Sequence, residues 1–456
     1  MEILASPEES SMSPEDIARL PLPPGSAGLP LLGETLAFMR NTGGFIEERR
    51  QRHGDVFRSH VLGEPIAFLL GPEANRWIFA GENKYLRNRW HVAGRKLLGD
   101  QSVAMLNGAA HLTRRRLLAP HFTYNAMRAF APRIEAITHR HCEQWAARTE
   151  PFKAVDAVRA LVFEVAISLI LGDGKAVDAA YMNRLFRQWA GGLFSPVPLD
   201  IPFTPFGRAV AAGKEMHAYL ESLVVAREKL TEQPPDVLGS LLSTRDEEGR
   251  PLPREAILQE IELQLYAGHD TTVTVTSNLL LLLAQHPEVL ERCRQEQRGL
   301  EQGPLTLETL RAMPYLHQVI QEAMRFINPV GGSFRVTTQD VAYGGYRIPK
   351  GWQVALCIIG AHQGPPWTDS KRFDPERMGP ERCEQKPPGA YVPFGGGPRV
   401  CLGQHFAMVE MAAIVSLLLR DYQWELVPGQ DLSLKSFPIP IPRSGLLVRF
   451  SPLQHP

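Results

Sequence analysis

The sequence predicts a mainly α-helical protein with small β-sheets, in which one large domain spans residues 21–456. Helical periodicity runs through four long segments, residues 126–148, 158–171, 208–230 and 253–298. Short strand patterns occur at Val56–Leu70 and at Asp340–Leu356, where Gly344-Gly345 predicts a hairpin turn. The motifs described below span residues 108–403 and must converge on one site. We therefore expect one fold, although 456 residues allow two or three domains.

The N-terminal residues predict a loosely ordered segment, residues 1–20. Met1–Arg19 is acidic and rich in serine and proline, and it lacks the apolar run of a signal peptide or membrane anchor. Residues 21–33 then predict a stiff, turn-rich lead-in. Between Trp189 and Arg208, glycine, proline and phenylalanine exclude a helix. This apolar loop is either a lid over the entrance for an apolar substrate or a connection packed into the core.

Charge and cysteine content restrict the compartment and the partners. Lys plus Arg and Asp plus Glu both number 49, which gives no support for nucleic acid or an anionic membrane as a partner. The chain contains five cysteines without a Cys-x-x-Cys pair: Cys142, Cys293, Cys357, Cys383 and Cys401. An odd number without a disulfide framework is typical of a reducing compartment, with one special thiol and four inert ones. We expect a soluble cytoplasmic protein.

The most informative segment is Phe394–Gly403, which reads FGGGPRVCLG and precedes an apolar-periodic helix at Gln404–Leu419. Backbone N–H groups and the positive end of the helix dipole would keep Cys401 ionised, as a metal-binding thiolate requires. The glycines would let a large flat cofactor lie against the backbone, and Arg399 would offer a forked cation to its acidic edge. The alternative is a buried free cysteine in a glycine-rich turn.

Residues 253–284 predict one long helix of about 45 Å, at ~1.5 Å per residue, interrupted only at the run AGHDTT of residues 267–272. Its apolar interior indicates a helix buried on most sides, with too few apolar residues for a membrane span. Gly268 would leave space for a ligand, and the Thr271 hydroxyl can bond to a carbonyl one turn back. Asp270 beside Thr271 could pass protons. A helix that simply tolerates one Gly and two Thr is the alternative.

Two further charged pairs lie at helical spacing. Glu322 and Arg325 share a face of a helix that begins near Pro314 and ends before Pro329. His111 and Arg115 are one turn apart and can reach the same anion. The alternatives are surface ion pairs and, for Arg114 and Arg116, a solvated basic face.

Phe394, Gly397, Arg399, Cys401 and Gly403 match the cysteine-ligand loop of the cytochrome P-450 family, which the chain resembles over nearly its whole length. The resemblance implies haem b with Cys401 as the axial ligand of the iron. It implies the following cofactor-binding residues: His111, Arg115, Ala267, Arg335, Phe394, Gly395, Arg399, Cys401 and Gly403. The AGHDTT run resembles the oxygen-activation segment of the family, in which the acid and the threonine, here Asp270 and Thr271, deliver protons.

The same resemblance assigns structural and substrate-contacting residues. Glu322 and Arg325 would join Arg377, from the run DPER, in a buried Glu-Arg-Arg network, with Met378 in place of the usual phenylalanine. Small residues would flank the substrate pocket near the iron: Val330, Gly331 and Gly332. Three stretches, residues 29–36, 192–199 and 329–335, resemble the branch of soluble cyanobacterial retinoid-hydroxylating enzymes and animal retinoic-acid hydroxylases.

The resemblance implies a monooxygenase that inserts one oxygen atom of O2 into a C–H or C=C bond of a retinoid, terpenoid, steroid or fatty acid. With no flavin or iron–sulfur segment present, electrons would come from a ferredoxin or flavodoxin with its reductase, docking near Arg114 and Arg116. The intact Asp270-Thr271 pair argues against peroxide-using and oxygen-independent members of the family. We expect a monomer. A haem-binding sensor without turnover is the alternative, whereas nucleotide-dependent chemistry lacks any P-loop or strand-led Gly-x-Gly-x-x-Gly motif.

Overall fold

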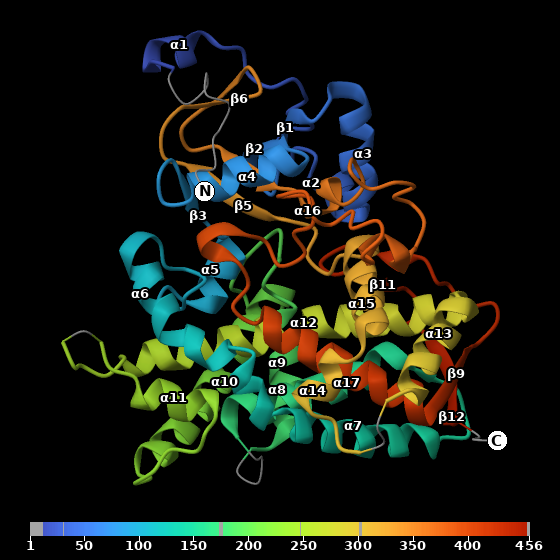
Figure 1. Ribbon diagram of the computed structural model, residues 1–456. Coiled ribbons are helices and arrows are strands. Elements are labelled where there is room, and N and C mark those ends of the chain that lie inside the picture. The colour runs from blue at the N-terminus through green and yellow to red at the C-terminus, as the bar shows by residue number, and fades with distance from the viewer. Residues whose placement is uncertain (1–11, 31, 173–176, 247, 301–302, 454–456) are drawn as a thin grey trace. The chain divides into compact units, whose positions relative to one another are not determined.

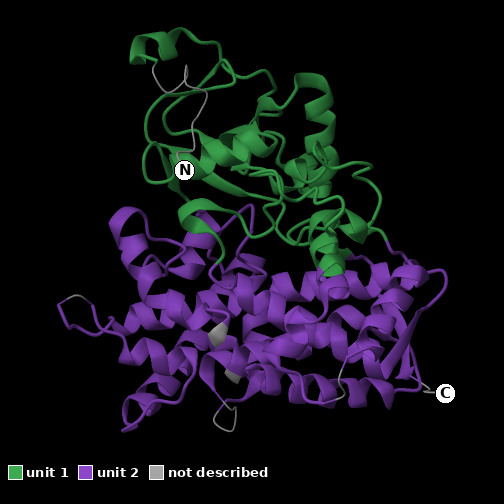
Figure 2. Cartoon of the chain, viewed as in Figure 1, with its two compact units in different colours: residues 1–89, 318–401, 433–441 green, residues 90–317, 402–432, 442–456 purple. Residues whose placement is uncertain are grey.

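The computed structural model describes residues 12–453 except residues 31, 173–176, 247 and 301–302 (Figure 1). The chain divides into two compact units that interleave along the sequence (Figure 2). Unit 1 comprises residues 1–89, 318–401 and 433–441, and unit 2 comprises residues 90–317, 402–432 and 442–456. Helices predominate and the sheets are small, so the mainly α fold class is confirmed.

The N-terminal segment contains one short helix. Residues 14–19 form helix α1 (Pro14–Arg19), because the Ser13 hydroxyl accepts a hydrogen bond from the backbone N–H of Asp16 and Pro14 suits the first helical turn. The remainder of the segment for which we expected loose order, residues 1–11, lies outside the described residues. The lead-in that follows is turn-rich as expected and forms isolated bridges, one of them between Leu29 and Gly33.

Unit 1 is built on a five-stranded sheet with the strand order β1-β2-β8-β5-β3. Its strands are β1 (Val56–Val61), β2 (Glu64–Leu69), β3 (Leu86–Asn88), β5 (Ser333–Thr337) and β8 (Gln353–Leu356). A separate hairpin pairs β6 (Val341–Tyr343) with β7 (Tyr346–Ile348) around the glycine turn that the sequence predicted. Gly344 and Gly345 both have positive φ, at 59° and 78°, as a two-residue hairpin turn requires.

Helices and aromatic packing complete unit 1. Its helical segments are α2 (Thr35–Arg40), α3 (Thr42–His53), α4 (Pro72–Gly81), α16 (Ile358–Ala361), the 3₁₀ turns η4 (Pro375–Met378) and η5 (Gly397–Arg399), and the part of α15 (Pro314–Phe326) from residue 318 onward. The rings of Phe57 and Phe68 stack at 4.9 Å between centroids on neighbouring strands, and Phe45 packs against Phe68 at 6.0 Å. These buried rings join the first helices of the unit to its sheet.

Unit 2 is predominantly helical. Its helices are α5 (Val92–Leu98), α6 (Gly108–Leu118), η2 (Ala119–Phe122), η3 (Asn125–Ala129), α7 (Ala131–Ala146), α8 (Ala154–Leu171), α9 (Ala179–Ala190), α10 (Pro205–Glu228), α11 (Val237–Ser243), α12 (Arg254–Gln285), α13 (Pro287–Arg298), α14 (Leu307–Arg311) and α17 (Gln404–Asp421). A three-stranded sheet of β4 (Phe152–Lys153), β12 (Leu447–Pro452) and β9 (Tyr422–Leu426) joins them. The short strands β10 (Leu434–Lys435) and β11 (Ile441–Pro442) pair with each other. In the described part of the chain, no helix has the length and hydropathy needed to cross a membrane.

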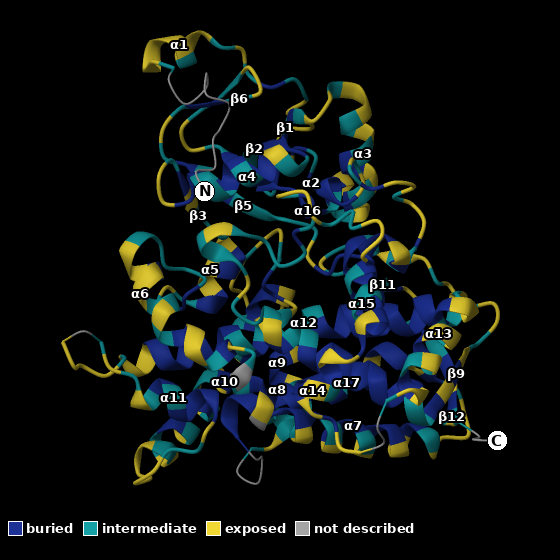
Figure 3. Ribbon diagram, viewed as in Figure 1, coloured by how far each residue is buried: buried dark blue, intermediate teal, exposed yellow. Residues whose placement is uncertain are grey.

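Helix α12 is the longest element and lies largely in the core, with its apolar run from Leu279 to Leu283 buried (Figure 3). The sequence predicted an interruption at residues 267–272, and this was wrong because the helix is continuous from Arg254 to Gln285. The Thr271 hydroxyl donates to the Ala267 carbonyl at 2.8 Å, as expected, but it does so within an intact helix. Pro287 is the first residue of α13, so it marks the boundary between α12 and α13.

The apolar loop between α9 and α10 is helix-free at residues 191–204. The exclusion of a helix between Trp189 and Arg208 is therefore correct for the loop but wrong at its ends, where residues 190 and 205–207 are helical. Most of its middle is exposed, including Val197 and Phe203, and Phe203 is 88% exposed. Leu193 and Phe206 at its two ends are buried in the helical core. A connection packed wholly into the core is therefore excluded, whereas the lid interpretation stays a prediction.

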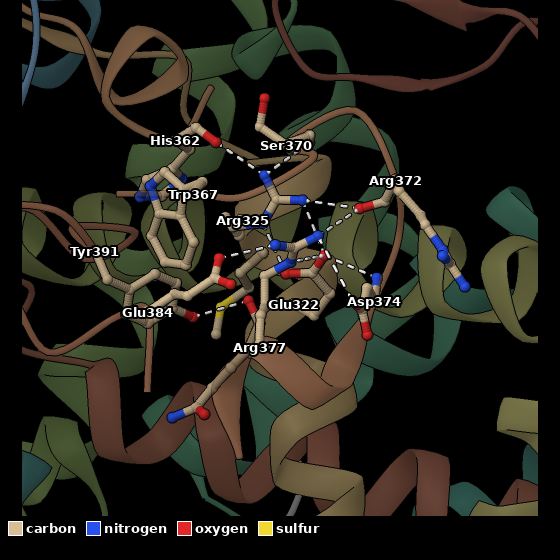
Figure 4. A network of polar contacts seen from close by, with 12 residues as sticks. Glu322, Arg325, His362, Trp367, Ser370, Arg372, Asp374, Arg377, Glu384 and Tyr391 are labelled. Atoms are coloured by element: carbon tan, nitrogen blue, oxygen red, sulfur yellow. Dashed lines mark hydrogen bonds and ion pairs between the residues drawn. The ribbon is translucent and has the colours of Figure 1, made fainter. Parts of the chain in front are cut away.

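A buried polar network holds the segment that follows α16 (Figure 4). Glu322 accepts hydrogen bonds from Arg325 at 2.7 and 2.8 Å and from Arg377 at 3.0 Å, and all three side chains are almost fully buried. The two guanidinium groups also donate to backbone carbonyls, namely those of His362, Thr368, Asp369, Ser370 and Arg372. The network thus binds an irregular segment through fixed forks of N–H donors.

Glu384 adds a second carboxylate to this network. It accepts a hydrogen bond from the Arg377 Nη1 at 2.8 Å and from the Thr368 hydroxyl at 2.6 Å (Figure 4). Burial opposes ionisation of this carboxyl group, but the hydrogen bonds from Thr368, Arg382 and Arg377 outweigh it and lower the pKa of Glu384 to about 2.

Because the folded-state pKa of Glu384 lies below its ordinary value of 4.5, its stabilising contribution is present above pH 4.5 and is lost as the pH falls toward 2. We expect Glu384→Gln to destabilise the protein by about 1–3 kcal/mol at pH 7, as for a hydrogen bond to a charged group. The difference in the free energy of unfolding between the variant and the wild type should become smaller as the pH is lowered. Thermal unfolding between pH 7 and 3 would measure it. Glu381→Gln, at an exposed position nearby, is the control. A difference that stays constant with pH would contradict this reading.

Candidate functional site

The cysteine loop folds back on itself at the end of the second segment of unit 1, residues 318–401. The Cys401 backbone N–H donates to the Phe394 carbonyl at 2.9 Å, and the Val400 N–H donates to Gly397 at 3.1 Å across the turn η5. Two residues further along the chain, Gly403 caps the start of α17. Helix α17 begins at Gln404 as predicted, so the loop leads directly into a helix N-terminus.

Cys401 differs from the other cysteines in its exposure. None of the five cysteines forms a disulfide, and Cys401 alone is exposed, whereas Cys142, Cys293 and Cys357 are buried. Burial raises the pKa of each of these three thiols to about 12, so they stay protonated at neutral pH. The thiol of the loop is therefore the one that is accessible to a metal-containing ligand.

The glycines of the loop make room for a protein side chain. A Cβ atom at Gly396 would overlap the ring of Phe79, on α4, and one at Gly397 would lie 2.9 Å from the Phe79 Cβ. The expectation that these two glycines let a cofactor approach the backbone is thus corrected, because their Cβ directions face α4. Gly395 has φ +69° and no atom within 4 Å of its Cβ direction, which leaves that side open.

Arg335 and Arg399, both expected at the acidic edge of a cofactor, meet at one carboxylate. Glu82 follows the last turn of α4 and is almost fully buried. Its Oε2 accepts from the Arg335 Nε at 2.5 Å, and its Oε1 accepts from the Arg399 Nε at 2.6 Å. Two guanidinium groups on one carboxylate sum to one positive charge, which is electrostatically compatible with a further anion. Sequence reasoning missed Glu82 because its partners lie 253 and 317 residues away.

The other predicted anion-binding pair lies on α6 of unit 2. His111 is buried at 2% exposure, and Arg115 lies one turn further on the same helix. Arg114 is not part of a solvated basic face, which corrects the sequence interpretation. Its Nη1 donates to Glu260 on α12 at 3.1 Å, whereas Arg116 is exposed as expected. The contact between Arg114 and Glu260 could not be predicted from the sequence, because the two residues are 146 positions apart.

The middle of α12 contains a short accessible stretch between buried segments. Ala267 is exposed and Gly268 has no atom within 4 Å of its Cβ direction, whereas Val273–Leu283 is buried. Asp270 and Thr271 are half-buried at the same stretch. One exposed alanine and one half-buried glycine beside an acid and an alcohol offer a surface on which a flat group can lie. The residues therefore fit the cofactor that the cysteine loop implies.

Two buried side chains next to this stretch were not singled out from the sequence. His269 is 1% exposed and contacts Asp270, with 2.9 Å between Nδ1 and Oδ1. Glu410 on α17 is fully buried and accepts from the Thr272 hydroxyl at 3.2 Å. Burial raises the pKa of Glu410 to about 8, which the hydrogen bond from Thr272 opposes. Polar residues on an otherwise apolar helix were the only available signal.

The residues expected at the substrate pocket follow α15 in unit 1. Val330 is 38% exposed, which leaves its side chain accessible. A Cβ at Gly331 would lie 2.9 Å from the Ile359 Cδ1, and one at Gly332 would overlap the Leu356 carbonyl. The two glycines are thus required by packing against α16 and β8. Their contact with a substrate stays a prediction.

The predicted residues therefore form two sets. In unit 1, Glu82 joins Arg335 to the cysteine loop, and Glu322, Arg325 and Arg377 form the network of Figure 4. In unit 2, α12 carries Ala267, Asp270 and Thr271, and the pair Arg114–Glu260 joins α12 to the helix that carries His111 and Arg115. Unit 1 thus carries an exposed cysteine and buried arginines, which suit a metal and an anionic group, and unit 2 carries an accessible acid-alcohol pair.

Comparison with known proteins agrees with this arrangement. A family model described as Cytochrome P450 matches residues 23–450. Putative cytochrome P450 120 from Synechocystis sp. is 38% identical over 444 residues, which cover 97% of this chain and 99% of that relative. Cytochrome P450 26C1 from Mus musculus is 32% identical over 478 residues, with 97% and 91% covered. The solved structure described as retinoic acid bound cyanobacterial CYP120A1 has a TM-score of 0.91, covers 95% of this chain and 100% of that chain, and is 38% identical.

The family resemblance expected from the motifs is thus confirmed over almost the whole chain. From the family match and these relatives, together with the exposed cysteine of the loop, we conclude that this protein is a cytochrome P450, a monooxygenase of the haem b-binding family.

Proposed function

We propose that this monooxygenase oxidises an elongated apolar substrate of the retinoic-acid type. The observation that carries the proposal is the similarity to a cyanobacterial structure described as retinoic acid bound, at 38% identity over 95% of this chain. The exposed apolar side chains at residues 197–203 support it, because an apolar loop of this kind can contact an apolar substrate before it enters. The unbroken family match over residues 23–450 supports one functional domain over residues 21–456.

The haem would be bound by the residues that the family motifs assign. Cys401 would ligate the iron, and three other residues of the same loop would contact the haem: Phe394, Gly395 and Gly403. Four cationic or polar side chains would bind the propionates: His111, Arg115, Arg335 and Arg399. Bound haem supplies the iron at which O2 is cleaved, with two electrons and two protons consumed, one oxygen atom transferred to a C–H or C=C bond and the other released as water. Ala267 would lie against the cofactor.

The acid and the alcohol of α12 would manage protons. Asp270 is half-buried and can exchange a proton with water, while the Thr271 hydroxyl donates to Ala267 and keeps its oxygen lone pairs available as acceptors. Both side chains lie on an accessible stretch in the middle of α12 and are themselves half-buried. Proton transfer through positioned side chains contributes about 10²–10⁴-fold in typical enzymes.

Electrons would come from a separate ferredoxin or flavodoxin with its reductase, and the enzyme would act as a monomer. Arg116 is exposed and can contribute positive potential for an acidic carrier. Arg114 is removed from this role because it pairs with Glu260. Val330, Gly331 and Gly332 would border the bound substrate.

We expect Cys401→Ser to remove the thiolate-specific absorption band of the reduced, carbon monoxide-bound protein and to lower product formation to background, because a neutral hydroxyl cannot replace the thiolate. Product formation would be measured with NADPH, a ferredoxin and its reductase. Cys383→Ser, at a half-buried position outside the loop, is the control. Unchanged absorption and turnover in Cys401→Ser would refute the assignment, and a haem protein without product would instead indicate a sensor.

Titration of the ferric protein with retinoic acid should displace water from the iron and shift the absorption spectrum, since an apolar ligand excludes water from the site. We expect retinoic acid to bind more tightly than a terpenoid, steroid or fatty acid of similar length. A steroid or fatty acid that binds at least tenfold more tightly than retinoic acid would overturn the substrate proposal while leaving the reaction type intact.

Glu82→Gln should destabilise the protein and accelerate haem loss, because two buried guanidinium groups would lose their shared carboxylate. Breaking a buried charge pair costs about 3–5 kcal/mol. Thermal unfolding and transfer of haem to an apoprotein acceptor would measure the two effects. Glu73→Gln on the same helix removes an exposed pair with Arg76, for which at most about 1 kcal/mol is expected. Equal behaviour of the two variants would show that Glu82 holds neither arginine in place.

A further inference from the structure

His269 is held in one orientation inside unit 2. It lies on α12 directly before Asp270 and is 1% exposed. Its ring meets the ring of Phe163 edge-on at 5.5 Å and that of Phe186 at 5.0 Å. The imidazole is thus packed against two rings, and each of its ring nitrogens faces one partner.

Both partners of the imidazole are oxygen atoms. The Nε2 lies 3.2 Å from the backbone carbonyl oxygen of Arg159 on α8, and the Nδ1 lies 2.9 Å from the Asp270 Oδ1. A carbonyl oxygen has no proton to donate, so the hydrogen bond to Arg159 requires a proton on Nε2. The tautomer of His269 is therefore decided by its surroundings.

The second contact then requires another proton. A neutral imidazole with its proton on Nε2 presents a lone pair at Nδ1, and an ionised Asp270 presents a lone pair at Oδ1. Two lone pairs at 2.9 Å repel, so a proton must lie between them, either on Nδ1 or on Oδ1. The His269–Asp270 pair thus contains one proton more than a neutral histidine beside an ionised aspartate.

Two other ionisable groups lie near the pair, and neither supplies the proton between Nδ1 and Oδ1. Tyr266 lies one turn earlier on α12, and burial together with the Asp270 charge raises the pKa of its phenol well above the ordinary value. Tyr266 therefore remains a neutral group at neutral pH. The Arg159 guanidinium pairs with Asp156 at 3.4 Å and is turned partly to solvent.

Asp270 connects the enclosed imidazole to the accessible stretch of α12. The His269 side chain is 1% exposed, whereas that of Asp270 is 26% exposed. Thr271 follows directly, and its hydroxyl donates to Ala267 at 2.8 Å, so its lone pairs can accept. A proton held between Nδ1 and Oδ1 can leave through Oδ1 or Oδ2 toward that stretch, and solvent can reload it.

We propose that His269 is a positioning residue that keeps one exchangeable proton on the His269–Asp270 pair, next to Thr271. On release, the pair changes from its protonated form to neutral His269 beside ionised Asp270, and one proton passes to an acceptor at the accessible stretch. The destination of that proton rests on the function proposed above, whereas its presence on the pair does not.

The presence of the proton can be tested on the reduced, carbon monoxide-bound holoenzyme, which is diamagnetic. At pH 7 we expect either nitrogen-15 resonances of one imidazole protonated at both nitrogens, or an infrared band of a protonated carboxyl group. The signal should disappear in His269→Gln, whose amide can donate to Asp270 without holding an extra proton. A carboxyl band should also disappear in Asp270→Asn. Neutral His269 together with ionised Asp270 in the wild type would overturn the proposal, even if the variants fail to fold.

The consequence for turnover is tested separately. We expect His269→Gln to lower kcat by roughly tenfold, below the ~10²–10⁴-fold of a full acid-base group because water partly substitutes. The affinity for retinoic acid should not change, and more of the NADPH electrons should appear as hydrogen peroxide. The control is His217→Gln, because His217 on α10 is likewise a histidine that contacts an acidic residue of α12, namely Glu262. Unchanged kcat and coupling in His269→Gln would overturn the role in proton delivery. If the wild-type protein itself lacks the thiolate-specific absorption band, the result would instead count against the proposed function.

Discussion

Buried arginines that share a carboxylate are the constraint on which unit 1 depends. Glu322 binds Arg325 and Arg377, and Glu82 binds Arg335 and Arg399. Each carboxylate joins segments that are far apart in the sequence, and a guanidinium group left without its partner would be a buried unpaired charge. The irregular segment after α16 and the cysteine loop therefore take their positions from charge pairing, in a region with little regular secondary structure.

The cysteine loop combines this charge constraint with a steric one. Gly396 and Gly397 fit against Phe79, and Arg399 of the same loop binds Glu82, which follows the same helix α4. The short helix α4 thus supports the loop through the ring of Phe79 in its last turn and through the carboxylate of Glu82 directly after its end. The exposed Cys401 lies at the end of a loop that is already fixed by the protein, which is the preorganisation that a metal ligand requires.

Helix α12 shows how an apolar element can carry polar chemistry without losing its structure. Its buried segments supply the packing, and the hydroxyls of Thr271 and Thr274 bond to carbonyls of the preceding turn. Glu260 pairs with Arg114 on α6, and Asp270 contacts its neighbour His269, whose other ring nitrogen faces the Arg159 carbonyl on α8. Between these segments, side-chain packing leaves the stretch at Ala267–Thr271 accessible except for the buried His269.

The sequence by itself determined the mainly α fold, the cysteine loop before α17, the long helix α12, the hairpin at Gly344-Gly345 and the family, because these features rest on local periodicity and on motifs of fixed spacing. Only the tertiary structure decided the partners of Arg114, Arg335 and Arg399, the contact of Gly396 with Phe79, and the enclosure of His269. Each of these depends on which distant segments meet in the folded chain. A hydrogen bond over 317 residues leaves no trace in local pattern, since its energy is gained only after the core has formed.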